Sequence, residues 1–140
     1  MTGSHGLTLN ELMITVIIVS VLAGLAIPSY LRAVEKARGG EALGTLRLIR
    51  AAEKVYYFDS SSFYTDLTVA VQGNLVGQGY IQNPNGDLQR AFDYSVLSNN
   101  GANPRSFTAT AKRISGCNKN ETITLDNAGT QGGTWSFQCP

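Results

Sequence analysis

Charge is nearly absent from the start of this chain. Among the first 31 of its 140 residues, the only formal charge is Glu11. Charged residues make up 15% of the whole sequence, below the ~25% that is usual in soluble domains. Beyond this stretch the composition is that of a small globular domain. The sequence therefore predicts an apolar N-terminal rod and one head of roughly a hundred residues, long enough for a modest core.

Histidine is also scarce. The only histidine is His5, which makes histidine general-base catalysis and multi-histidine metal sites poor candidates. No nucleophile motif or cluster of metal ligands compensates, so we expect no enzyme, no catalytic residues, no cofactor and no metal. The net charge is +1, so nucleic acid is not an expected partner by default.

An apolar run of 21 residues extends from Leu7 to Ile27. As a helix it would be about 31 Å long, enough to cross the core of a bilayer. An ordinary cleaved secretory signal needs a basic start and a shorter apolar region, and MTGSHG contains neither Lys nor Arg. Gly24 and Pro28 interrupt the run near its end. Because proline lacks a backbone donor and clashes with the preceding turn, we expect a kink there.

A second helical pattern covers residues 30–58. Apolar residues recur there every three or four positions, which predicts one buried helix face; they are Ala42, Leu46, Ile49, Ala52 and Tyr56. Basic residues lie on the side expected to face solvent. Three i,i+3 ion pairs are possible: Arg32–Glu35, Arg38–Glu41 and Arg50–Glu53. Taken together, Leu7 to Phe58 reads as one long kinked helix with an apolar first half and an amphipathic second half.

The pattern then changes twice. Residues 59–90 are rich in Gly, Asn and Ser and read as loop. Apolar residues then alternate with period two in four segments, residues 92–96, 106–112, 121–126 and 134–138, with turn residues between them. The predicted fold class is α+β: the long kinked helix packs on a four-stranded antiparallel β-meander that occupies residues 91–140.

Two cysteines, Cys117 and Cys139, lie near the end of the chain. In an exported protein an even pair predicts one disulfide, whereas in a cytosolic protein two free thiols would be favoured. The N-terminus indicates export, so we predict a bridge between them. It would tie the last hairpin together and would contribute on the order of 3 kcal/mol in the chain-entropy account.

The N-terminal sequence Gly6-Leu7-Thr8-Leu9-Asn10-Glu11-Leu12 resembles the processing motif of the type IV pilin family. The next residues, MITVIIVSVLAGLAIPSY, are similar to the segment that follows in that family. The resemblance implies the pilin fold, with a leader peptide (1–6), a transmembrane and filament-core helix half (7–29) and a globular head (30–140). It also implies that a prepilin peptidase cleaves between Gly6 and Leu7 and methylates the new amine of Leu7.

The resemblance further implies a function. The subunit would wait in the bacterial inner membrane and then join an extracellular helical homo-oligomer with the help of the inner-membrane pilus assembly machinery. Glu11 would neutralise the N-terminal amine of a neighbouring subunit and set its register. A carboxylate in an apolar helix costs about 2.5–3.5 kcal/mol on insertion scales, so such a residue is expected to have a partner. The chain departs from the family in having Leu7 as the first mature residue, where phenylalanine is usual, and in a leader without Lys or Arg.

Two other functions remain open. A pseudopilin of a type II secretion or DNA-uptake system shares this N-terminus, and a minor pilin is not distinguished from a major one. A membrane-anchored binding module that never polymerises belongs to another class, but it would need neither the Gly6–Glu11 motif nor the interruption at Pro28. The sequence does not indicate whether a filament would serve adhesion, twitching motility or DNA uptake.

Overall fold

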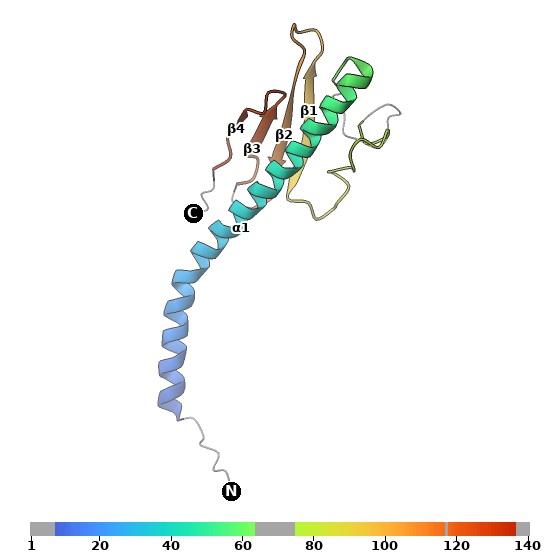
Figure 1. Ribbon diagram of the computed structural model, residues 1–140. Helices are drawn as coiled ribbons and strands as arrows, with labels where there is room; N and C mark the ends of the chain where they lie inside the picture. Colours follow the sequence, from blue (N-terminus) through green and yellow to red (C-terminus); the bar gives the residue numbers. More distant parts are fainter. Residues whose placement is uncertain (1–7, 64–74, 117, 137–140) are drawn as a thin grey trace.

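The computed structural model describes residues 8–63, 75–116 and 118–136 (Figure 1). One helix, α1 (Leu9–Ser60), precedes four strands, which are β1 (Phe92–Asn99), β2 (Ser106–Arg113), β3 (Thr122–Asp126) and β4 (Gln131–Gly133). The C-terminal half of α1 lies across one face of the sheet, and the N-terminal half projects away from it (Figure 1). The α+β class with one long N-terminal helix is therefore confirmed.

The sheet is the expected meander. Its strand order is β1-β2-β3-β4, and each strand is antiparallel to the next. Val96 on β1 lies opposite Ala109 on β2, and Ala109 lies opposite Leu125 on β3. Since residues paired across strands share a face of the sheet, this register aligns the apolar residues of three strands toward α1.

The fourth strand was predicted in the wrong place. The alternation of Trp135 and Phe137 indicated residues 134–138, but β4 covers only Gln131–Gly133. The tight turn after β3 explains the difference, because Asp126 Oδ1 accepts hydrogen bonds from the backbone N–H groups of Gly129 and Thr130 at 2.7 Å and pairing resumes at once. Trp135 still contributes to the core, with its ring 5.2 Å from that of Phe92.

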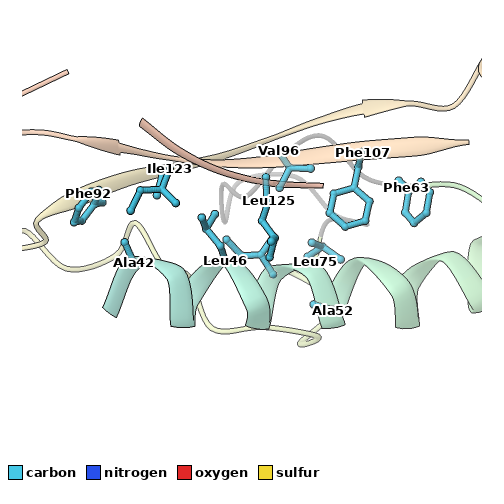
Figure 2. Close-up of a cluster of buried hydrophobic side chains, with 13 residues drawn as sticks. Ala42, Leu46, Ala52, Phe63, Leu75, Phe92, Val96, Phe107, Ile123 and Leu125 are labelled. Atoms are coloured by element: carbon cyan, nitrogen blue, oxygen red, sulfur yellow. The ribbon is translucent and has the colours of Figure 1, made fainter. Parts of the chain in front are cut away.

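The core lies between α1 and the sheet (Figure 2). Four of the five predicted helix positions are buried, and the fifth, Tyr56, is half-buried and packs edge-on against Tyr80. Leu75 and Phe63, from the connection between α1 and β1, complete the cluster. The sheet contributes Phe92, Val96, Phe107, Ala109, Ala111, Ile123 and Leu125.

Candidate functional site

The N-terminal half of α1 is the most unusual surface of the molecule. Every described residue from Leu9 to Leu31 is exposed, although most of them are apolar. By length and composition this is a helix that could cross a membrane. The chain therefore contains a helix long and apolar enough to serve as the predicted membrane anchor.

Glu11 lies in the first turn of this half and has a partner within its own chain. Thr8 is the N-cap of α1, and its backbone N–H and Oγ1 donate to Glu11 Oε2 at 2.9 and 2.8 Å. In return the Glu11 N–H donates to Thr8 Oγ1 at 3.3 Å. This reciprocal arrangement is a capping box, a local role that the sequence analysis missed although the Thr-x-x-Glu spacing indicates it. Gly6 and Leu7, the predicted cleavage site, lie outside the described residues.

The predicted interruption at Gly24 and Pro28 does not break the helix. α1 is continuous from Leu9 to Ser60 with Pro28 inside it, and its axis changes direction between the two halves (Figure 1). Pro28 has no N–H for the carbonyl of the residue four positions earlier, which is Gly24. A Cβ on Gly24 would meet no atom within 4 Å, so packing among the described residues does not require a glycine there.

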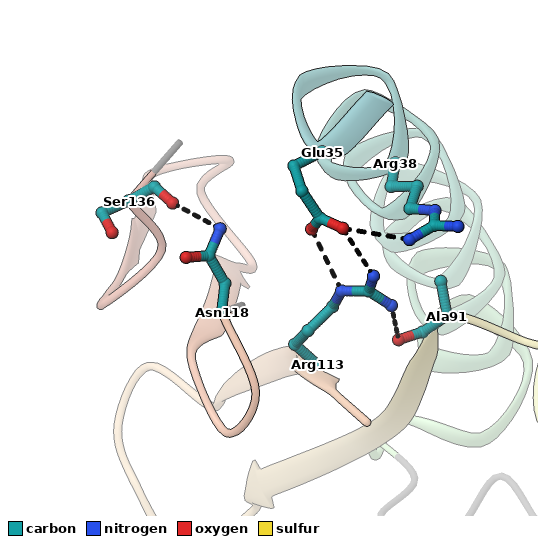
Figure 3. A network of polar contacts seen from close by, with 6 residues as sticks. All are labelled: Glu35, Arg38, Ala91, Arg113, Asn118 and Ser136. Atoms are coloured by element: carbon teal, nitrogen blue, oxygen red, sulfur yellow. Dashed lines mark hydrogen bonds and ion pairs between the residues drawn. The ribbon is translucent and has the colours of Figure 1, made fainter. Parts of the chain in front are cut away.

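A buried ion pair joins α1 to the sheet just beyond the exposed half (Figure 3). Arg113, at the end of β2, donates from Nη2 to Glu35 Oε1 at 2.8 Å and from Nε to Oε2 at 3.2 Å. Its Nη1 donates to the Ala91 carbonyl at 2.8 Å, which also fixes the start of β1. Arg38 adds a second cation, 3.0 Å from Glu35 Oε1. Both members of the main pair are buried, with 1% of Arg113 and 4% of Glu35 exposed.

This contact corrects the predicted pairing of Glu35 with Arg32 on the solvent side. Burial by itself would raise the pKa of Glu35, but the hydrogen bonds and charge of Arg113, followed by those of Arg38, outweigh it and hold the pKa below its ordinary value. The sequence contained a signal for this site. Arg113 continues the alternating apolar positions of β2 and so had to point inward, where an arginine needs an acidic partner.

A second contact joins α1 to the turn between β3 and β4. Arg50 donates from Nε to the Asn127 carbonyl at 3.2 Å and from Nη2 to the Ala128 carbonyl at 2.9 Å. Gly129 has a φ of 97°, and a Cβ there would lie 3.1 Å from the guanidinium, so this turn requires glycine. Arg50 was predicted to pair with Glu53, but these hydrogen bonds direct its guanidinium to the turn. The head is thus fixed to α1 at two separate points.

The predicted disulfide lies outside the described residues, because neither cysteine is among them. The nearest described residues, Asn118 and Ser136, are joined by a hydrogen bond of 2.8 Å from Asn118 Nδ2 to the Ser136 carbonyl (Figure 3). Two described residues close to the cysteines in the sequence are therefore in contact. The pairing itself stays a prediction.

The described part of the head has at least two hollows. One of about 620 Å³ is mainly polar and lies between the end of α1 and the β1–β2 turn, where its lining includes Tyr57, Asn100 and Arg105. The other, of about 310 Å³, is mainly apolar and lies between Gly39-Gly40 of α1 and Trp135.

No group of three or more potential metal ligands occurs within the part of the chain that the structure describes. No known protein-family model matches the chain.

Proposed function

We propose that this chain is the structural subunit of a type IV pilus, held in the inner membrane by the N-terminal half of α1 and then assembled through that half into an extracellular helical filament. The observation that supports it most is the continuity of α1. One unbroken helix has a first half that is apolar and exposed on all sides and a second half fixed to a sheet.

A helix that is apolar on every face is stable only where something covers it. The described residues of the head leave Leu9–Leu31 exposed, so in this proposal the cover comes from outside the chain. Lipid supplies it before assembly, and the helices of other copies supply it in a filament. The same segment can serve both states because hydrocarbon chains and apolar side chains offer it a similar environment.

The N-terminal motif supports processing and assembly. Cleavage between Gly6 and Leu7 leaves an amine four residues before Glu11. A filament that brings the amine of one copy to the carboxylate of another neutralises both charges in an apolar core. The partners are a prepilin peptidase, the assembly machinery of the inner membrane and further copies of this chain.

The decisive experiment is mass spectrometry on filaments sheared from the cells that make this protein. An abundant peptide that begins at methylated Leu7 is the expected result. A processed peptide that stays in the cell-bound fraction would favour a pseudopilin instead. A chain that still carries residues 1–6 in these cells would contradict the proposal and favour a membrane-anchored module that does not polymerise.

Substitutions at Glu11 separate its two roles. Glu11→Ala is expected to reduce sheared filaments to background while cleavage continues. Glu11→Gln keeps an acceptor for the Thr8 hydrogen bonds but removes the charge, and we expect it to fail equally. Thr8→Ala is the matched control, since it weakens the cap and keeps the carboxylate, and it should still assemble. Normal filaments from Glu11→Gln would show that Glu11 acts only as part of the helix cap and that its charge has no role in assembly.

A further inference from the structure

Positive charge gathers at the end of the head from which the N-terminal half of α1 projects. We call this end the base (Figure 1); it consists of residues 32–38 in α1, 90–93 at the start of β1, 112–116 at the end of β2 and 118–121 in the turn before β3. The base contains seven basic and three acidic residues, whereas the rest of the chain after Leu31 contains four basic and six acidic ones. The head is therefore polarised, with a positive base and a slightly negative remainder.

The acidic side chains of the base are already engaged, and several of its basic side chains are not. The engaged carboxylates are those of Glu35, Asp93 and Glu121, which contact Arg113, Arg90 and Ser136 respectively. Four basic side chains are exposed and form no ion pair with any residue that the structure describes: Arg32, Lys36, Lys112 and Lys119. Exposed cations are normally hydrated, so what these four meet depends on where the base lies.

Tyr30 indicates the level of the base relative to a membrane. Tyrosine is enriched where the hydrocarbon core meets the headgroups, and Tyr30 is 67% exposed near the end of the apolar run. If the core ends one residue later, Arg32 and Lys36 lie about 1.5 and 7.5 Å beyond it along α1. The headgroup layer is roughly 5–8 Å thick on each side. Both cations therefore lie at headgroup level, whereas Arg47 and Lys54 stand about 24 and 35 Å beyond the core.

The sheet brings a third cation to the same end of the head. Arg32 and Lys36 are four residues apart and so lie on one side of α1. A Cβ on Gly116 would lie 3.5 Å from Glu35 Oε1, which places the turn after β2 beside this segment of the helix. Lys119 belongs to that turn, and its N–H donates to the Gly116 carbonyl at 3.3 Å. Folding thus assembles the positive base from two separate parts of the chain.

We propose that the base of the head binds the acidic headgroups of phospholipids on the side of the membrane that bears the head. An anionic phosphodiester supplies the counter-charge that the chain does not, and its oxygens accept the N–H groups of arginine and lysine. Basic residues just outside a membrane-spanning helix are attracted to anionic lipid in this way. The contact rests on the membrane anchor in the proposed function and does not depend on filament assembly.

Spin-labelled lipids test the contact with the full-length chain. The chain is reconstituted in phosphatidylcholine vesicles that contain a trace of either phosphatidylglycerol or phosphatidylcholine with a nitroxide on its acyl chain. Electron paramagnetic resonance separates lipid beside the protein from bulk lipid and so gives the ratio of the two association constants. We expect phosphatidylglycerol to be favoured roughly fivefold at low salt, the effect of about one basic residue at an acidic surface. The ratio should fall toward one at high salt, because the cations are exposed.

Two double variants locate the preference on the chain. Arg32→Gln with Lys36→Gln should bring the ratio close to one. Arg47→Gln with Lys54→Gln is the matched control, because it removes the same two charges from the same helix beyond the headgroups, and it should keep the wild-type ratio. Unchanged fluorescence of Trp135, the only tryptophan, shows that each head is folded. Equal association of both lipids with the wild type, or equal effects of the two double variants, would overturn the contact.

A wash with alkaline carbonate separates this contact from the anchor itself. A chain that the wash removes from the vesicles would contradict both the membrane anchor and the contact. A chain that resists the wash but shows no lipid preference would contradict the contact alone and would leave the proposed function in place.

Discussion

The two halves of α1 form one helix, yet different interactions stabilise them. Between Glu35 and Ser60 the helix packs its buried face on the sheet and is fixed by Arg113 and by its own Arg50. Between Leu9 and Leu31 no described residue of the head covers it. Helical structure alone therefore does not show what stabilises a segment, because most helix stability in proteins comes from packing. Of the substitutions in α1, only those in its second half should change the stability of the head.

The buried ion pair should show the largest effect. Arg113→Met leaves Glu35 buried without its main partner, and we expect a loss of about 3–5 kcal/mol in the free energy of unfolding. Urea unfolding followed by Trp135 fluorescence measures it. The matched control is Arg90→Met, which removes an ion pair with Asp93 whose carboxylate side chain is 54% exposed, and we expect a cost below about 1 kcal/mol. Equal losses in the two variants would show that the buried ion pair stabilises the head no more than the exposed one does.

Two leucines on opposite faces of the same helix give the next comparison. Leu46 is fully buried and Leu48 is 64% exposed. Leu46→Ala should cost about 2–5 kcal/mol, because it removes apolar contact and leaves a cavity. Leu48→Ala should stay within about 0.5 kcal/mol. A large loss at Leu48 in the isolated subunit would contradict this comparison, because it would show that the exposed side of the helix also stabilises the head.

Part of the pH dependence of stability should come from Glu35, in the second half of α1. The pKa of Glu35 is lower in the folded protein than its ordinary value of 4.5. Its contribution is therefore present above that value and is lost as the pH falls through the lower folded pKa. Glu35→Gln should flatten the fall in stability in acid. Asp126 is the control, because backbone hydrogen bonds from Thr130 and Gly129 also lower its pKa, at a half-buried site outside α1. Asp126→Asn should leave the Glu35 contribution in place.

Pro28 should have the smallest effect on the head. Pro28→Ala supplies the missing donor to the Gly24 carbonyl and favours a straighter helix. The free energy of unfolding of the head should change by less than about 0.5 kcal/mol, since both residues are exposed and outside the core. The same urea curve tests this. A shift above about 1 kcal/mol would show that the two halves are energetically coupled.

Local patterns predicted the fold where periodicity was long and regular. The long helix, its buried face and the order of the strands followed from spacing alone. The fourth strand was misplaced because Trp135 and Phe137 alternate like strand residues, whereas Asp126 and Gly129 close a turn that starts pairing earlier. Glu11 was assigned to another copy, and its hydrogen bonds to Thr8 within the chain were missed.

The sequence by itself determined that Leu7 to Ile27 is apolar, that a helix continues beyond it and that an alternating sheet follows, because each property depends on residues close together in the chain. Only the tertiary structure decided that Glu35 pairs with Arg113, 78 positions away, and that Arg50 holds the β3–β4 turn. It also left Leu48, Val55 and Phe58 outside the core. Such contacts depend on which residues folding brings together, and no local period encodes that.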